Sequence, residues 1–248
     1  MSFFKKLGPG LLFAGAAIGV SHLVQSTRAG ADYGLGLIWA LVLVNIFKYP
    51  FFQYGPRYAM ATGESLLEGY RKLGKGVLVI YFILTLATMF TIQTAVTIVT
   101  AGLAVELFGV TAHTTHWGIG LILICSLMLV VGRYNTLDRL MKIIITTLSI
   151  STLLAVLLAT QSTEIPTWKP SFPNQEAGLV FLIAFMGWMP GPLDISVWHS
   201  LWTLEKKKSV QDFGLKSSLF DFNVGYATTF FLGGCFLLLG ALVMYGSG

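Results

Sequence analysis

Long apolar stretches recur along the chain, and most of them are close to the length that crosses a membrane. A transmembrane helix needs about 20 predominantly apolar residues. Because these stretches are continuous and not alternating, they predict helices and not the strands of a barrel. We therefore expect an all-α integral membrane protein with seven spans. The spans are predicted at residues 8–27, 34–57, 76–108, 117–132, 143–161, 177–202 and 221–246.

The composition fits a protein whose solvent is the lipid bilayer. Hydrophobic residues make up 55% of the chain and charged residues only 11%, whereas soluble domains carry about 25% charged residues. The net charge of +5 follows the positive-inside rule: with a cytoplasmic N-terminus, Arg28 and Lys169 lie outside and thirteen other lysines and arginines lie inside. The basic residues thus predict the topology in an inner or plasma membrane, and they argue against a nucleic-acid partner.

Two of the predicted spans are interrupted by polar or helix-breaking residues. The first contains "GVSHLVQS" at residues 19–26, and the sixth contains "GWMPGP" at residues 187–192. Pro190 and Pro192 each lack a backbone N–H, so a continuous helix is not expected there. Backbone groups freed at membrane depth must be buried in protein or face a watery cavity.

Breaks that lie five spans apart are typical of transporters built from inverted repeats, whose substrate binds between the breaks near the midplane. The first repeat would cover residues 1–161 and the second would begin in residues 177–248, all in a single transmembrane domain (1–248). Five spans carry the chain to the outside, so the sixth runs antiparallel to the first. Since only two helices of the second repeat are present, we expect a fragment, a truncated relative that must associate, or a protein that has lost transport.

Several motifs resemble those of one known family. The stretch "LGPGLLFAGAAIGVSHLVQSTRAGADYGLGLIW", with Asn45 and "ATG" at 61–63, is similar to the first two helices of Nramp (natural resistance-associated macrophage protein) type metal ion transporters. "WMP" at 188–190 resembles their sixth-helix signature, "LFG" at 107–109 resembles the end of their third helix, and Asp221 fits the start of their seventh. The resemblance implies a LeuT-like fold, a divalent metal ion as substrate and, often, proton coupling.

The sequence departs from that family at the expected metal ligands. Where the family has "DPGN", this chain has Gly19, Val20, Ser21 and His22, so the ligating carboxylate is absent, which counts against proton coupling. The family's sixth-helix methionine falls on Met189, and imidazole and thioether groups suit softer transition metals. The resemblance therefore implies His22 and Met189 as metal ligands. The predicted substrate-binding residues are Gly19, Ser21, His22, Met189, Gly191 and Asp194.

Three ionisable residues inside the spans each allow two interpretations. Lys48 would either extend to the cytoplasmic interface or take the place of a bound cation or proton and pair with Asp194. His22 would be either an interior histidine that donates to a backbone carbonyl or a ligand or titrating group. Asp194 would either supply charge to the site or simply mark a helix end.

The chain contains no motif that predicts an enzyme or a cofactor. A phosphate-binding loop, a zinc-protease pattern and a Ser, His, Asp arrangement are all missing. We predict a secondary transporter that moves a metal ion, expected to be divalent, by alternating access between the first and sixth spans. The alternatives are a non-transporting sensor or assembly subunit that keeps the fold, and a transporter of a different small solute. The predicted partners are the lipid bilayer and a small inorganic ion.

Overall fold

A computed structural model describes residues 7–109, 113–132, 134–210 and 212–246, and these residues form helices and connecting segments without any strand. The predicted all-α fold is confirmed. The chain divides into two compact units, one made of Met1–Leu66 with Leu140–Gly248 and the other of Leu67–Arg139. Each unit is described by itself.

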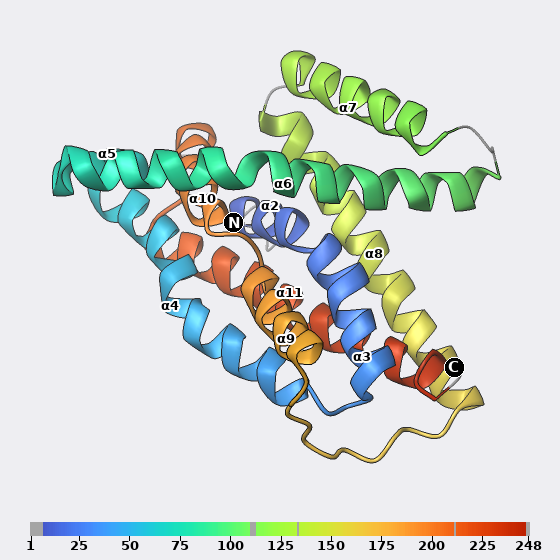
Figure 1. Cartoon of the computed structure of the whole chain (residues 1–248). Helices are drawn as coiled ribbons and strands as arrows, with labels where there is room; N and C mark the ends of the chain where they lie inside the picture. The colour runs from blue at the N-terminus through green and yellow to red at the C-terminus, as the bar shows by residue number, and fades with distance from the viewer. Residues whose placement is uncertain (1–6, 110–112, 133, 211, 247–248) are drawn as a thin grey trace. The chain divides into compact units, whose positions relative to one another are not determined.

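The first unit is built around α11 (Leu215–Val243). This helix packs against α2 (Pro9–Ala17), the π-helix η1 (Ser21–Ser26), α3 (Thr27–Tyr33) and α4 (Ile38–Thr62). Figure 1 shows α11 crossing behind α3 and extending toward α4. Two further helices, α9 (Glu176–Trp188) and α10 (Asp194–Ser209), pack on α4, and α10 also packs on α2. The elements on either side of the first break therefore pack on α11, and those on either side of the second break pack on α4.

Glycines allow α11 to approach the first span at van der Waals contact with its backbone. A Cβ built on Gly225 would come 1.9 Å from the carbonyl oxygen of Gly10, and one on Gly240 would come 1.9 Å from that of Thr27. Small residues at such crossings let membrane helices pack closely. The first span and α11 thus form one tightly packed pair on both sides of the break.

Aromatic side chains fill the space between α2, α4 and α11. Phe13 lies against Phe52, Phe222 and Tyr226, with ring centroids 5.3, 5.7 and 5.8 Å away, respectively. Burial of these large rings contributes strongly to stability, and their offset and edge-on contacts add to it. The Tyr226 hydroxyl donates to the carbonyl of Asn45 at 2.6 Å, so the polar end of this buried ring is satisfied.

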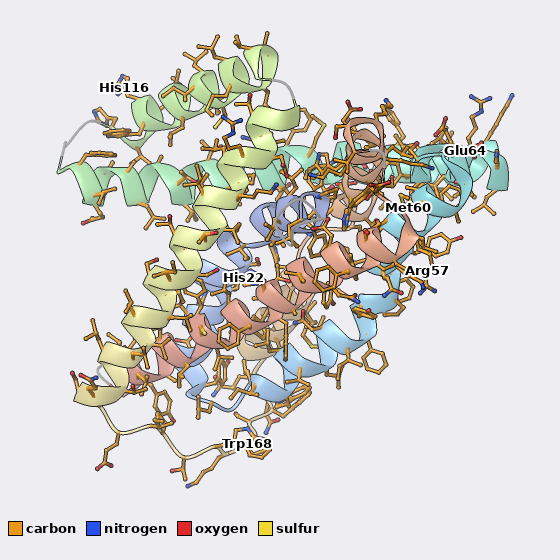
Figure 2. The ribbon with its side chains drawn as sticks, turned by 180° about the vertical axis from the view of Figure 1, so that it is seen from behind. His22, Arg57, Met60, Glu64, His116 and Trp168 are labelled. Carbon is orange, nitrogen blue, oxygen red and sulfur yellow. The ribbon has the colours of Figure 1, made fainter. Side chains whose placement is uncertain are left out.

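α8 (Tyr134–Ser162) contributes to the first unit from Leu140 onward. Its Ile145 is buried with Ala14, Ile18 and Leu232 in an apolar cluster beside the end of α2. After α8 the chain runs in an irregular segment, in which Figure 2 labels Trp168. This segment is held to the start of α4, because Ser171 donates its N–H to Gly36 and accepts from the Trp39 indole at 3.0 Å.

The second unit is formed by α6 (Lys75–Phe108), α7 (Thr114–Val131) and the short α5 (Leu66–Leu73). α6 and α7 pack together, and the rings of Phe108 and Trp117 stack with centroids 5.3 Å apart. Most of the large apolar side chains of these helices are exposed. Apolar helices with exposed side chains are expected of segments that face lipid or further protein within a membrane.

Four helices of the described chain are long and apolar enough to cross a membrane: α6, α7, α8 from Thr136, and α11. The bent pair Pro9–Ala17 and Ser21–Tyr33 makes a fifth when counted as one span. The predicted number of seven is not reached by this measure. The second predicted span, α4, contains Lys48 and Arg57, and the sixth is divided because α9 ends after only 13 residues.

Candidate functional site

The first break lies between α2 and η1. α2 ends at Ala17, and Ile18 leaves the helical conformation with φ −80° and ψ 86°. The chain resumes as a π-helix, in which the N–H groups of His22 and Leu23 both donate to the carbonyl of Gly19. The two halves of the span are bent by 51°. The predicted interruption of the first helix is thus present at the predicted residues.

His22 is the polar centre of this break, and its side chain is fully buried. Its Nδ1 lies 2.7 Å from the Ser21 hydroxyl, and its Nε2 lies 3.0 Å from the carbonyl oxygen of Thr229 on α11. Figure 2 shows His22 where the first span meets α11. Because a carbonyl only accepts, Nε2 must carry a proton and donate. His22 therefore joins the break to α11.

The Ser21 hydroxyl has a single proton but lies within hydrogen-bond distance of two groups that could accept it. It lies 2.8 Å from the carbonyl of Ala17 and 2.7 Å from Nδ1 of His22. A hydroxyl has one proton to donate. With neutral His22, this proton goes either to Ala17 or to Nδ1. With protonated His22, Nδ1 donates to the hydroxyl and the hydroxyl donates to Ala17. The Ser21–His22 pair can therefore accommodate a proton without any rearrangement of heavy atoms.

The second break lies between α9 and α10. α9 ends at Trp188, Met189 is extended, the Met189–Pro190 peptide is cis, and α10 begins at Asp194. A Cβ built on Gly191 would meet the Cδ1 of Ile195 at 2.6 Å and the Cβ of Ala17 at 3.4 Å. Gly191 therefore lies directly against the end of α2, and the structure brings the two breaks together.

Lys48 of α4 is bound to the second break. Its Nζ donates to the carbonyl oxygens of Met186, Gly187 and Met189 at 2.8, 2.8 and 2.7 Å, respectively. These bonds use all three protons of the ammonium group. The ammonium of Lys48 thus reaches across to α9, where the break offers it three carbonyls. The predicted pairing of Lys48 with Asp194 stays a prediction.

Met189 and Asp194 have different surroundings. The Met189 side chain is fully buried in an apolar cluster with Leu37, Phe185 and Leu237. Asp194 is half-buried and lies in the first turn of α10, where a carboxylate is favoured by the helix dipole. Within the part of the chain that the structure describes, no group of three or more His, Cys, Asp or Glu side chains could hold a metal ion.

Comparison with known proteins identifies the family. The model of the family described as "Natural resistance-associated macrophage protein-like" matches residues 10–248. The chain belongs to the Nramp family. An uncharacterised protein of Pasteurella multocida (strain Pm70) is 38% identical over 251 residues, which cover 99% of this chain and 58% of the relative.

The solved structure of a manganese transporter is similar over almost the whole chain. The manganese transporter of Eremococcus coleocola, determined in complex with an aromatic bis-isothiourea substituted compound, matches with a TM-score of 0.76 at 18% identity. The match covers 98% of this chain and 53% of the transporter. The chain therefore forms a part of the LeuT-like fold, and it spans little more than half the length of the relatives that it matches.

The structure also reveals a buried carboxylate that the site prediction omitted. Asp221 of α11 is 1% exposed and accepts the backbone N–H groups of Gly8 and Gly10 at 2.9 and 2.7 Å. These N–H groups have no intrahelical acceptor because they lie at the start of α2. An aspartate at the start of a predicted apolar span was the available signal, since a buried carboxylate must find donors.

A second omitted residue is His199 of α10. Its ring is fully buried between Phe13 and Phe222, with centroids 5.7 and 5.6 Å away. Neither ring nitrogen has a hydrogen-bond partner among the described residues. The sequence places His199 ten residues after Met189, but this spacing alone does not indicate that the histidine is buried among aromatic rings.

Proposed function

We propose that the chain is part of a secondary transporter that moves a metal ion, expected to be divalent, across the membrane by alternating access. The observation that carries the proposal is the contact between the two breaks, where Gly191 lies against Ala17. Broken helices that meet within a membrane domain expose backbone groups to a bound solute. Membership of the Nramp family supports a metal ion as that solute.

The substrate would bind at Gly19, Ser21 and His22 of the first break, next to the place where Gly191 lies against Ala17. Imidazole and thioether ligands favour a transition metal over Mg²⁺ or Ca²⁺. In the described conformation both ring nitrogens of His22 are hydrogen-bonded and Met189 is buried. Binding through these residues therefore requires His22 to exchange a hydrogen bond and the second break to open. Such an opening would be a step of the transport cycle.

The orientation follows from charge. The positive-inside distribution of lysine and arginine supports a cytoplasmic N-terminus. With this orientation α2 begins at the cytoplasmic side and the breaks lie within the bilayer.

Ion uptake into proteoliposomes tests the proposal. The whole natural protein would be reconstituted and presented with Mn²⁺, Mg²⁺ and Ca²⁺, with and without a pH gradient. We expect saturable Mn²⁺ uptake that His22→Ala reduces at least tenfold. The matched control is His116→Ala, since His116 is an exposed histidine of α7. Uptake that is unaffected by His22→Ala, or the absence of uptake of every metal, would contradict the proposal. A dependence on the pH gradient would show proton coupling.

A sensor or assembly subunit is the second candidate function. It is favoured by the hydrogen bonds that occupy both His22 and the carbonyls of the second break. Calorimetry combined with the uptake assay separates the two functions, because both bind the metal ion but only a transporter carries it across the membrane. Binding by the intact protein together with no uptake in liposomes would favour the sensor.

A further inference from the structure

We propose that the carbonyl oxygens of Met186, Gly187 and Met189 form a monovalent-cation site, and that Lys48 fills this site with a cation tethered to the chain. The proposal concerns the second break alone and does not depend on metal transport. It assigns Lys48 a role in selectivity: its ammonium group excludes inorganic ions from three carbonyls that would otherwise bind them.

The sequence explains why these carbonyls are available. In a continuing helix the N–H four residues later would bond each of them, but Pro190 has no N–H to give Met186. The chain leaves the helix at Met189, so the carbonyl of Gly187 also loses its helical partner. They lie at the C-terminal end of α9, where the helix dipole is negative and attracts a cation.

The distances identify the kind of cation. The three oxygens lie 2.7 to 2.8 Å from one common centre, the Nζ of Lys48. Mg²⁺ needs about 2.0–2.1 Å and Ca²⁺ about 2.3–2.6 Å, with carboxylates among the ligands. Ammonium donates hydrogen bonds at about this length, and neutral backbone carbonyls also replace the hydration shell of K⁺ in channel filters. The site therefore suits ammonium or K⁺.

The tether is short and comes from a neighbouring helix. Lys48 is half-buried on α4, which packs directly on α9. Attachment to α4 removes most of the entropy that a free ion loses on binding, because the ammonium is already held near the site. A tethered ammonium group therefore competes effectively with free ions for the same oxygens.

Replacement of the tethered cation by a free one tests the proposal. Lys48→Met keeps the length of the side chain and removes its charge. The unfolding temperature of the intact protein would be measured in KCl, NH₄Cl, NaCl and choline chloride at equal chloride concentration. We expect the variant to unfold about 4–8 °C lower in choline chloride. Ammonium and potassium should restore most of the loss in a saturable way. Sodium and choline should not, and the wild type should not respond.

Lys208→Met is the matched control, because Lys208 is exposed and, among the described residues, its ion pair is with Glu205 one turn away in α10. It loses the same charge but should show no cation-specific shift. If Lys48 only caps α9, Lys48→Met should lose stability and no cation should restore it. An equal response to all four salts, or none, would therefore overturn the proposal.

Lys48→Gln serves if Lys48→Met does not fold in choline chloride. Glutamine keeps an amide donor for the carbonyls, so a smaller loss with the same order of cations is expected. Purification of either variant only in ammonium or potassium would support the proposal. Failure of both variants to respond to, or to be recovered by, any cation would overturn it.

Discussion

Gly10 and Gly225 are in direct backbone contact: a Cβ on Gly225 would lie 1.9 Å from the Gly10 carbonyl oxygen. Real Cβ atoms do not approach so closely, so Gly225→Ala must push α11 away from α2. We expect a loss of more than about 3 kcal/mol in the free energy of unfolding. The control is Gly234→Ala on the same helix, where a Cβ meets nothing within 4 Å. It should be neutral or stabilising by up to about 1 kcal/mol. Equal effects of the two variants in denaturant titrations would contradict this packing.

Asp221 holds the start of α2 by two charged hydrogen bonds, from Gly8 and Gly10. Asp221→Asn keeps one acceptor oxygen but loses the charge, and we expect a loss of roughly 2–3 kcal/mol. Hydrogen exchange of the Gly8 and Gly10 amides should accelerate in the variant. Asp212→Asn, at an exposed aspartate, is the control and should change neither quantity. Unchanged exchange at Gly10 in Asp221→Asn would show that the cap is dispensable.

His199 has a buried ring whose two nitrogens lack partners among the described residues. His199→Phe keeps an aromatic ring between Phe13 and Phe222 and removes the unsatisfied polar atoms. We expect the unfolding free energy to stay the same or to rise by about 1 kcal/mol. His199→Ala, which leaves a cavity, should cost about 2–4 kcal/mol. A His199→Phe variant as unstable as His199→Ala would indicate that the imidazole nitrogens are needed.

The Trp39 indole fixes the segment before α9 by donating to the carbonyl of Ser171, while its ring stacks on Phe172 with centroids 6.1 Å apart. Trp39→Phe removes the hydrogen bond and retains a ring. We expect a loss of about 0.5–1.5 kcal/mol and faster proteolysis of the segment between α8 and α9. If limited proteolysis of Trp39→Phe matches that of the wild type, the indole bond does not hold this segment.

The sequence was most informative about where the helices break. Pro190 and the polar residues from Gly19 to His22 located both interruptions, because the loss of a backbone N–H and polarity inside an apolar run act locally. The family and its fold were also predictable from the first two helices. Local rules of this kind need no knowledge of which elements are neighbours.

Partners across the fold could not be predicted in the same way. The acceptors of Lys48 are backbone carbonyls more than 130 residues away, and a carbonyl carries no sequence signature. Asp194 was expected to pair with Lys48 because only side-chain charges are visible in a sequence. The hydrogen bond from His22 to Thr229 could not be predicted for the same reason, since its acceptor is also a backbone oxygen. The roles of Gly19, Ser21, His22, Met189, Gly191 and Asp194 in substrate binding stay predictions.

The bonds of Lys48 to the second break have an electrical consequence. A solute ion that crosses the membrane carries its charge from one side to the other, whereas the ammonium of Lys48 remains covalently attached and must return with α4. Moving one charge through the full membrane field costs about 2.3 kcal/mol per 100 mV. A displacement of the second break along the membrane normal that carries Lys48 with it therefore moves this charge within that field. This movement of charge would be recorded as a transient capacitive current that reverses on relaxation. It would add nothing to the steady current.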